Sequence, residues 1–160
     1  MLTLILITAV IAILYGLFLG NTILKKPEGN DRMKEIARAI QEGARAFLFR
    51  QYKTVAVIAL PLFLILGFLV NWPTAVAFIV GAVLSALAGI IGMSISVRAN
   101  VRTAEAARHG IAPALDVAVK GGAVTGLLVV GLALLGVAGL YAINPEVFNP
   151  RVLVGLSFGG

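Results

Sequence analysis

Four long stretches without a charged residue constrain this chain more than any other feature of its sequence. They contain 23, 17, 24 and 23 residues and cover residues 2–24, 54–70, 74–97 and 121–143. A helix rises about 1.5 Å per residue, so each of the three longer stretches can cross a hydrocarbon core of about 30 Å. The shortest reaches that length with one more turn from the residues before it, whose long side chains extend to the interface. We predict an all-α, polytopic membrane protein with four complete transmembrane helices.

The overall composition supports this prediction. Charged residues make up 12% of the chain and its mean hydropathy is +1.03, whereas soluble domains carry about 25% charged residues. The first stretch is not a typical signal peptide, because no Lys or Arg precedes it and it exceeds the usual hydrophobic region of about 7–15 residues. We therefore expect residues 2–24 to remain as the first transmembrane helix. The chain has no cysteine, which excludes disulfides and thiol chemistry within it.

The positive charge is concentrated in alternate linkers. Of the thirteen Lys and Arg residues, eight lie in the linker 25–53 and four in the linker 98–120, and none lies in the turn 71–73. Cytoplasmic segments of membrane proteins carry an excess of Lys and Arg. We therefore predict that the N-terminus is outside and that both basic linkers are cytoplasmic. This topology accounts for the net charge of +6, so we expect no nucleic-acid partner.

The linker 25–53 reads as an amphipathic helix that continues into the second apolar stretch. Asn30 or Asp31 is a suitable N-cap, and no helix breaker precedes residue 54. We expect Pro61 to kink the resulting long helix inside the membrane. The linker part has an apolar stripe and a charged stripe, and the charged stripe is predicted to form i,i+3 or i,i+4 ion pairs. The apolar stripe is Ile36, Ile40, Gly43 and Phe47, and the charged stripe is Glu35, Arg38, Glu42 and Arg45.

Turn-forming and small residues predict how the helices are connected and packed. The sequence Asn-Trp-Pro at 71–73 predicts a tight outer turn, while Gly110 is expected to end the third helix and Pro113 to begin the fourth. Small residues on one helix face allow close packing in membranes. We predict such faces in the third and fourth helices, formed by Gly81, Ser85, Ala88 and Gly92 in the third and by Gly122 and Gly126 in the fourth.

Residues 151–160 begin a fifth apolar segment that enters from the outside. The segment has ten residues, whereas crossing the bilayer takes about 20. A half-span leaves backbone polar groups unsatisfied in lipid unless protein surrounds them. We therefore expect residues 1–160 to be a single membrane domain that forms the N-terminal part of a longer protein.

The sequence offers little catalytic chemistry. All seven acidic residues lie outside the four uncharged stretches, although catalysis or ion relay inside a membrane normally uses ionisable groups. His109 is the only histidine and lies at a predicted helix end, where interaction with terminal carbonyls explains it without a catalytic or metal role. Gly155, Gly159 and Gly160 lack the Lys-Ser/Thr of a phosphate-binding loop, so we predict that they serve helix packing. We predict no catalytic, cofactor-binding or metal-ligating residue in this chain.

The wording of four segments resembles one family, the membrane-bound, ion-translocating inorganic pyrophosphatases. IARAIQEGARAFLFRQYKTVA at 36–56 resembles the cytoplasmic start of that family's second helix, and GMSISVRANVRTAEAAR at 92–108 its third helix and following loop. ALDVAVKGGAVTGLLVVGLALLG at 114–136 resembles its fourth helix, and VGLSFGG at 154–160 the opening of its fifth. The IQEGARAF and ANVRTA blocks are the most specific parts of the resemblance.

The resemblance implies a larger protein with sixteen transmembrane helices, usually a homodimer, in a lipid bilayer such as a prokaryotic inner membrane. Such a protein hydrolyses Mg²⁺-bound pyrophosphate on the cytoplasmic side and pumps H⁺ or Na⁺ outward, in some cases with K⁺. In the family, aspartates of the fifth and later inner helices hold Mg²⁺ and activate water, and these motifs begin beyond Gly160. The present helices then belong to the outer ring, and we expect the 160 residues alone to be inactive.

Two other functions remain as alternatives from the residues themselves. The absence of ionisable groups from the four uncharged stretches also suits a small, non-enzymatic helical membrane scaffold or assembly subunit. An ion channel formed by oligomers is a weaker alternative, because no polar stripe lines any of the predicted spans. The choice between H⁺ and Na⁺, and any K⁺ dependence, would follow from residues beyond this sequence.

Overall fold

The computed structural model describes residues 1–143 and 149–160 of the chain. Within these ranges it contains five α-helices and no strand, which confirms the all-α prediction. The helices are α1 (Leu2–Leu24), α2 (Asp31–Leu69), α3 (Trp72–Ala107), α4 (Ile111–Ile143) and α5 (Pro150–Gly159). The first four are long and apolar enough to cross a membrane.

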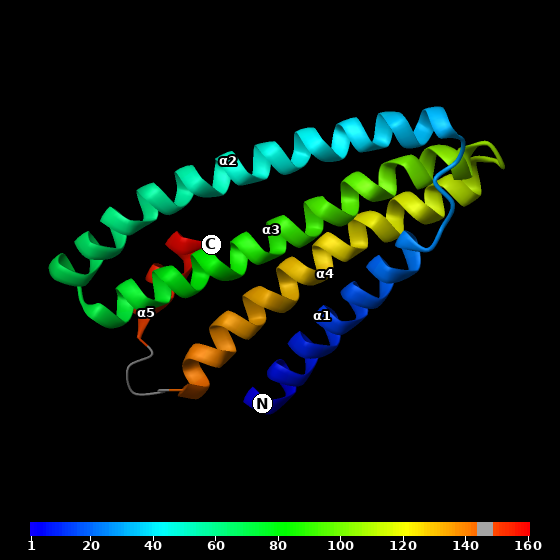
Figure 1. The fold of residues 1–160 in the computed structure, drawn as a ribbon. Coiled ribbons are helices and arrows are strands. Elements are labelled where there is room, and N and C mark those ends of the chain that lie inside the picture. The colour runs from blue at the N-terminus through cyan, green and yellow to red at the C-terminus, as the bar shows by residue number, and fades with distance from the viewer. Residues whose placement is uncertain (144–148) are drawn as a thin grey trace.

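Both basic linkers are largely helical and extend the helices of the neighbouring apolar stretches. α2 joins most of the linker 25–53 to the second stretch, as predicted, and α3 carries residues 98–107 beyond the third. α2 also stays helical through Pro61, and Figure 1 shows it as one bowed helix. The predicted cytoplasmic boundaries at residues 54, 97 and 121 therefore fall inside continuous helices, and the exact positions of the membrane boundaries stay a prediction.

α1, α3 and α4 form a three-helix body, and α2 and α5 pack against it (Figure 1). α4 packs against both α1 and α3, whereas α2 and α5 pack mainly against α3. The main core lies where α1, α3 and α4 meet, and a smaller one joins α3 and α5. The main core consists of Leu19, Ile23, Ile95, Ala99, Val117, Val124 and Leu128, and the smaller one of Ala77, Val152 and Leu156.

Three asparagine side chains cap the starts of helices. Asn30 Oδ1 accepts a hydrogen bond from the Met33 N–H at 2.9 Å, and Asn71 Oδ1 from the Thr74 N–H at 2.8 Å. Asn149 Oδ1 accepts from the N–H groups of Arg151 and Val152. Each cap satisfies a backbone donor that a helix start leaves free. The Asn71 cap confirms the tight turn at 71–73 between α2 and α3.

The turn between α3 and α4 differs from the prediction by one position. α3 ends with Arg108 as its C-cap, so Gly110 lies two residues beyond the cap and not one. Gly110 has φ +124°, a conformation that a residue with a Cβ rarely adopts. Pro113 lies in the first turn of α4, where a missing N–H costs no intrahelical hydrogen bond.

The small-residue face predicted for α3 is confirmed and serves two neighbours. A Cβ on Gly81 would collide with the Leu156 carbonyl of α5, and Ser85 Oγ donates to the Gly160 carbonyl at 2.8 Å. Farther along, a Cβ on Gly92 would lie 2.9 Å from the Thr125 side chain of α4. The face therefore allows α5 to approach one half of α3 and α4 the other half.

The prediction for the fourth helix was wrong. No atom of the described residues lies within 4 Å of a Cβ built on Gly122 or Gly126, whereas Cβ atoms on Gly121 and Gly131 would press against Ala99 of α3 and Ala9 of α1. Adjacent residues of a helix differ by about 100° in direction. Of the pair Gly121 and Gly122, one therefore faces the body and the other faces away from it.

Candidate functional site at the charged end of the bundle

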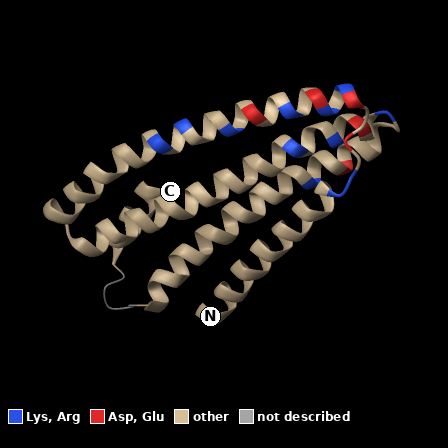
Figure 2. Cartoon of the chain, viewed as in Figure 1, with Lys and Arg blue, Asp and Glu red and all other residues tan. Residues whose placement is uncertain are grey.

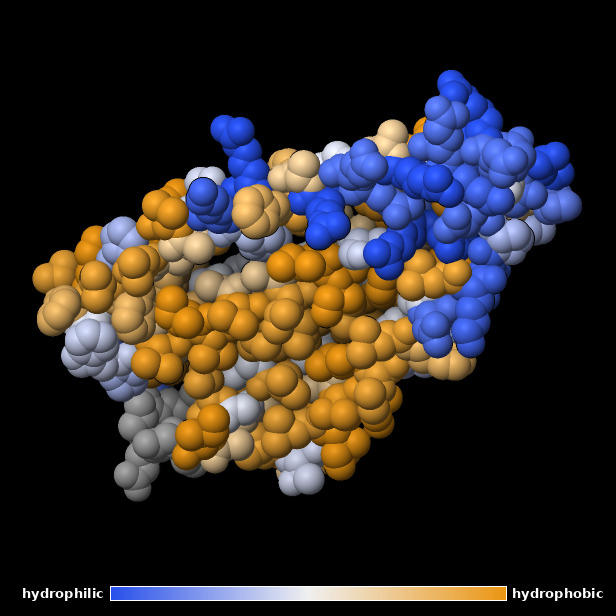
Figure 3. All heavy atoms as spheres, in the orientation of Figure 1, coloured by the Kyte–Doolittle hydropathy of each residue, from blue (hydrophilic) through white to orange (hydrophobic). Residues whose placement is uncertain are grey.

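Most of the charged residues gather at one end of the helix bundle (Figure 2), and Arg151 in the first turn of α5 lies apart from them. The linkers 25–53 and 98–120 both contribute to this end, although they are separated by two apolar stretches. Figure 3 shows the same division on the surface, with hydrophilic residues at this end and apolar residues over much of the rest of that face. The structure thus places the two basic linkers together, as the alternating charge pattern predicted.

Arg102 is the best-connected side chain at this end. It is 7% exposed, and its Nη2 donates to the Leu24 carbonyl at 2.9 Å and to Glu28 Oε1 at 2.9 Å. Its Nε donates to the Lys26 carbonyl at 3.1 Å, and its Nη1 to the Arg98 carbonyl at 2.7 Å. A buried guanidinium is stable when its donors are satisfied in this way. Arg102 therefore fastens the C-terminal end of α1 and the following loop to α3.

Sequence reasoning did not identify this role for Arg102. The residue counted only as one of four basic residues in the linker 98–120, and nothing in the helical pattern marks it as buried. Its carbonyl partners Leu24 and Lys26 lie 78 and 76 residues away, so no local spacing predicts them. The single available signal was its place in the ANVRTA block, which the family resemblance marks as specific.

Asp116 links the loop after α1 to α4. Its carboxylate lies 2.9 Å from Lys26 Nζ and 2.6 Å from Lys120 Nζ. Hydrogen bonds from Lys120 and then Lys26 hold the pKa of the Asp116 carboxyl below its ordinary value of 3.8. The pair with Lys120 has the local i,i+4 spacing of a helix, whereas the pair with Lys26 joins segments that are 90 residues apart.

Glu105 of α3 is another acidic residue at the charged end of the bundle. It forms an ion pair with Arg108 at 3.2 Å, and His109 Nε2 lies 4.0 Å away. A Cβ on Gly29 would lie 2.6 Å from Glu105 Oε2, and Gly29 itself has φ +82°. The positive φ favours glycine at this position of the loop before α2, whereas the ends of the flexible Glu105 and Met33 side chains could move aside for a Cβ. His109 is 73% exposed, in keeping with its predicted place at a helix end.

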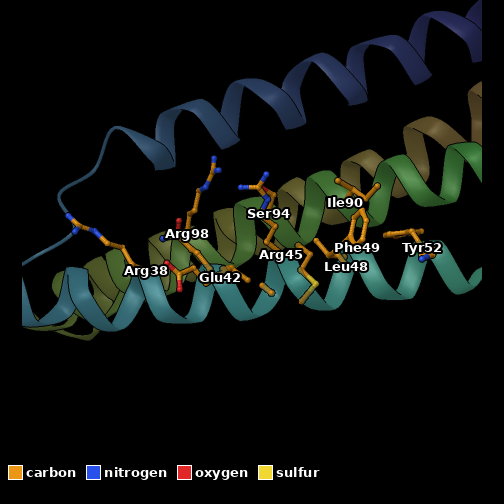
Figure 4. A pocket seen from close by; sticks show the side chains of 14 residues that line it. Arg38, Glu42, Arg45, Leu48, Phe49, Tyr52, Ile90, Ser94 and Arg98 are labelled. Atoms are coloured by element: carbon orange, nitrogen blue, oxygen red, sulfur yellow. The ribbon is translucent and has the colours of Figure 1, made fainter.

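The ion pairs predicted within the charged stripe of α2 do not form among the described residues, and Glu35 pairs instead with a residue outside the stripe. Arg32 pairs with Glu35 at 2.7 Å in the first turns of the helix. Among the residues that the structure describes, however, Glu42 has no basic partner within 4.0 Å, although Arg38 and Arg45 are at the right spacing. All three side chains instead line an open cleft between α2 and α3 (Figure 4), where water competes for exposed ion pairs.

This cleft has a volume of about 860 Å³. In addition to the three charged residues, α2 contributes Leu48, Phe49 and Lys53 to it, and α3 contributes residues between Ile90 and Arg98. Phe49 of α2 and Ile90 of α3 both line it (Figure 4). The apolar stripe of α2 does not pack on α3, because Ile36, Ile40 and Phe47 are 49%, 48% and 57% exposed.

Metal-binding chemistry is absent from the described residues. Within 1–143 and 149–160, no three His, Cys, Asp or Glu side chains lie together in a group that could hold a metal ion. The glycines near the C-terminal end pack closely against α3, since Cβ atoms on Gly155 and Gly159 would collide with the Thr74 and Phe78 carbonyls. That this chain carries no catalytic, cofactor-binding or metal-ligating residue stays a prediction.

Comparison with known proteins identifies the family. Residues 10–160 match the family model described as inorganic H⁺ pyrophosphatase. A K⁺-insensitive pyrophosphate-energized proton pump of Methanosarcina mazei is 48% identical over 155 residues, which are 96% of this chain and 23% of the pump. A K⁺-stimulated pyrophosphate-energized sodium pump of Thermotoga maritima is 50% identical over 107 residues, or 66% of this chain and 15% of the pump.

A third relative, a putative K⁺-stimulated pyrophosphate-energized sodium pump of Clostridium tetani, is 46% identical over 121 residues. That match covers 76% of this chain and 18% of the pump, so the chain spans less than a quarter of each of these relatives. Proton and sodium pumps thus match the same region at similar identity. With its four long apolar helices and a family match over residues 10–160, this chain is an integral membrane protein that belongs to the inorganic H⁺ pyrophosphatase family.

Proposed function

We propose that this chain supplies the first four transmembrane helices and the beginning of the fifth of a pyrophosphate-energised ion pump. The whole protein would couple hydrolysis of Mg²⁺-bound pyrophosphate in the cytoplasm to outward transport of H⁺ or Na⁺. The observation that carries this proposal is the match over residues 10–160 to the family model. The names of the relatives, which include proton pumps and sodium pumps, support both ions equally.

Within such a pump, residues 1–160 act as a scaffold and carry no catalytic residue. The acidic side chains Glu28, Glu105 and Asp116 are each paired with Lys or Arg. Mg²⁺ sites use several oxygen ligands that are free to face the metal, and the described residues do not offer such a set. We therefore assign the magnesium ligands, and any K⁺ site, to other parts of the whole protein.

The proposed orientation places the N-terminus outside and the charged end in the cytoplasm. The gathering of basic residues at one end of the bundle supports it, because cytoplasmic segments are rich in Lys and Arg. The proposed spans are 2–24, 54–70, 74–97 and 121–143 within a single membrane domain. A prokaryotic inner membrane and a homodimeric assembly complete the proposal, both on family resemblance.

The test uses the complete natural protein that contains this sequence, in inverted membrane vesicles. We expect pyrophosphate hydrolysis that requires Mg²⁺, together with acidification of the vesicle interior or uptake of ²²Na⁺ driven by pyrophosphate. The intact mass is measured in the same membranes. A native chain of 16.7 kDa without hydrolysis would replace the pump by the alternative of a non-enzymatic membrane scaffold.

A further inference from the structure

The cleft between α2 and α3 combines an unusual set of charges. Among the described residues, four cations line it and Glu42 is the one acidic residue on its walls. None of these cations has an acidic partner within 4.0 Å among the described residues, whereas Lys26, Arg102 and Lys120 at the same end are all paired. The four cations are Arg38, Arg45, Lys53 and Arg98. The cleft is therefore electrostatically suited to an anion that the described chain does not itself supply.

The remaining walls of the cleft are mostly apolar. Phe49 is 75% exposed and Ile90 41% exposed, and both face the cleft with Leu48, Met93 and Val97. A small soluble anion would leave these side chains in contact with water. An amphiphile with an anionic head and a hydrocarbon tail would satisfy both halves of the cleft.

The cleft also lies at the depth that such a ligand requires. α2 changes from basic to apolar after Lys53, and α3 changes from apolar to basic at Arg98. Both of these residues line the cleft. The cleft therefore extends across the proposed boundary of the membrane on both helices, with Ile90 on its apolar side and Arg45 on its charged side.

Contact between the helices leaves the cleft open. Only Ala37 and Gly67 of α2 are buried, so most of this helix does not seal against α3. Tyr52 marks one place where the two helices do meet, because a Cβ on Gly89 of α3 would collide with its hydroxyl. The side chains around this contact leave space for a flexible chain between the helices.

We propose that this cleft binds an anionic phospholipid from the cytoplasmic leaflet. Arg45, Lys53 and Arg98 contact the phosphate and headgroup, and an acyl chain lies along Leu48, Phe49 and Ile90. The lipid then fills the space that α2 leaves along α3 and holds the two helices together. Nothing in the proposed pump activity requires this ligand, so the two proposals can fail separately.

The first experiment measures lipid binding to the complete natural protein by native mass spectrometry. The protein is purified in detergent, stripped of lipid, and titrated with palmitoyl-oleoyl phosphatidylglycerol or with the zwitterionic phosphatidylcholine of the same chains. We expect tighter binding of phosphatidylglycerol. The double variant Arg45→Gln/Lys53→Gln should weaken it by about five-fold for each cation removed, while binding of phosphatidylcholine stays unchanged.

A matched double variant separates a defined site from diffuse attraction. Lys25→Gln/Arg50→Gln also removes one Lys and one Arg, and neither residue lines the cleft or has an acidic partner among the described residues. We expect it to bind phosphatidylglycerol as the wild type does. An equal loss in both double variants, or no preference for phosphatidylglycerol in the wild type, would overturn the proposal. Glu42→Gln, which removes the single anion of the cleft, should strengthen binding.

A second experiment identifies what occupies the cleft in a membrane. A photo-reactive benzoylphenylalanine replaces Phe49 in the complete protein, which is reconstituted in vesicles of phosphatidylglycerol and phosphatidylcholine and then irradiated. We expect a covalent adduct with the mass of a phospholipid. Cross-linking to another segment of the protein or to a second copy would show that protein fills the cleft, and would overturn the proposal.

Discussion

The helices of the three-helix body pack closely against one another, whereas the outer helix α2 packs loosely against α3. α3 buries eleven of its 36 residues, several of them Gly or Ala, while α2 buries two of its 39. The body relies on small side chains that allow backbones to approach, as membrane helices commonly do. α2 presents bulky apolar side chains and arginines, and it leaves a cleft beside α3. The size of the side chains at the helix contacts distinguishes the two regions more than their hydrophobicity does.

The same contrast holds for their arginines. Arg102 of the body is 7% exposed and donates to four acceptors. Arg45 of α2 is exposed and has no acidic partner among the described residues. A buried cation with satisfied donors contributes to one rigid arrangement, whereas an exposed one remains available to a ligand.

The largest expected effect comes from adding volume to the body. Gly81→Leu in the complete protein forces α5 away from α3, because the obstacle is the Leu156 backbone carbonyl and not a mobile side chain. We expect a loss of about 3 kcal/mol or more in stability, seen as a lower unfolding midpoint in detergent. Gly122→Leu is the control, since its Cβ meets no atom within 4 Å. Similar losses in both variants would contradict close α3–α5 packing.

Replacing the buried arginine is expected to be the next most damaging change. Arg102→Met keeps much of the side-chain volume but leaves the carbonyls of Leu24 and Lys26 without their donor. The expected loss is about 2 kcal/mol, the range for a hydrogen-bonded charged group. Thermal unfolding monitored by circular dichroism measures it. Arg50→Met on α2 serves as the control and should change stability little, because Arg50 is exposed, does not line the cleft and has no acidic partner among the described residues. Equal effects would remove the distinction between buried and exposed arginines.

A smaller effect should depend on pH. Because the pKa of Asp116 is lowered in the folded protein by Lys120 and Lys26, its stabilising contribution is present above its ordinary pKa of 3.8. It is lost as pH falls through the lower folded value. Asp116→Asn should therefore lower the unfolding midpoint at pH 7. Near pH 3, the difference in unfolding midpoint between this variant and the wild type should be smaller. A difference in unfolding midpoint between variant and wild type that is the same at pH 7 and pH 3 would show that the ion pairs do not contribute.

The smallest effect is expected at Glu42 of α2. If the ion pairs predicted for the charged stripe formed, Glu42→Ala would cost of order 0.5 kcal/mol. Glu42 has no basic partner within 4.0 Å among the described residues, so we now expect a change below about 0.5 kcal/mol. Glu35→Ala, which does break an ion pair with Arg32, is the matched comparison on the same helix. A larger loss for Glu42 than for Glu35 would contradict the open cleft.

Features that depend on neighbours in sequence were predictable, and features that depend on distant segments were not. The long α2, the Asn71 cap and the Asp116–Lys120 pair all follow from local spacing. The outward direction of Gly122 and the burial of Arg102 depend on which face of each helix meets the body. In an almost uniformly apolar helix such as α4, hydrophobic periodicity carries little information about that face. The family itself was recognisable because whole blocks of sequence, not single residues, carry it.

The Arg102 contacts also set an order of events during synthesis. Leu24, Lys26 and Glu28 accept hydrogen bonds from Arg102, which lies 78, 76 and 74 residues later in the chain. At about 5–20 residues per second, translation of that interval takes on the order of 4–15 s. During this time α1 is in the membrane without its fastening to α3. α1 therefore takes its final place only after α3 has been made, and the body is complete only when α4, which packs against both helices, has followed.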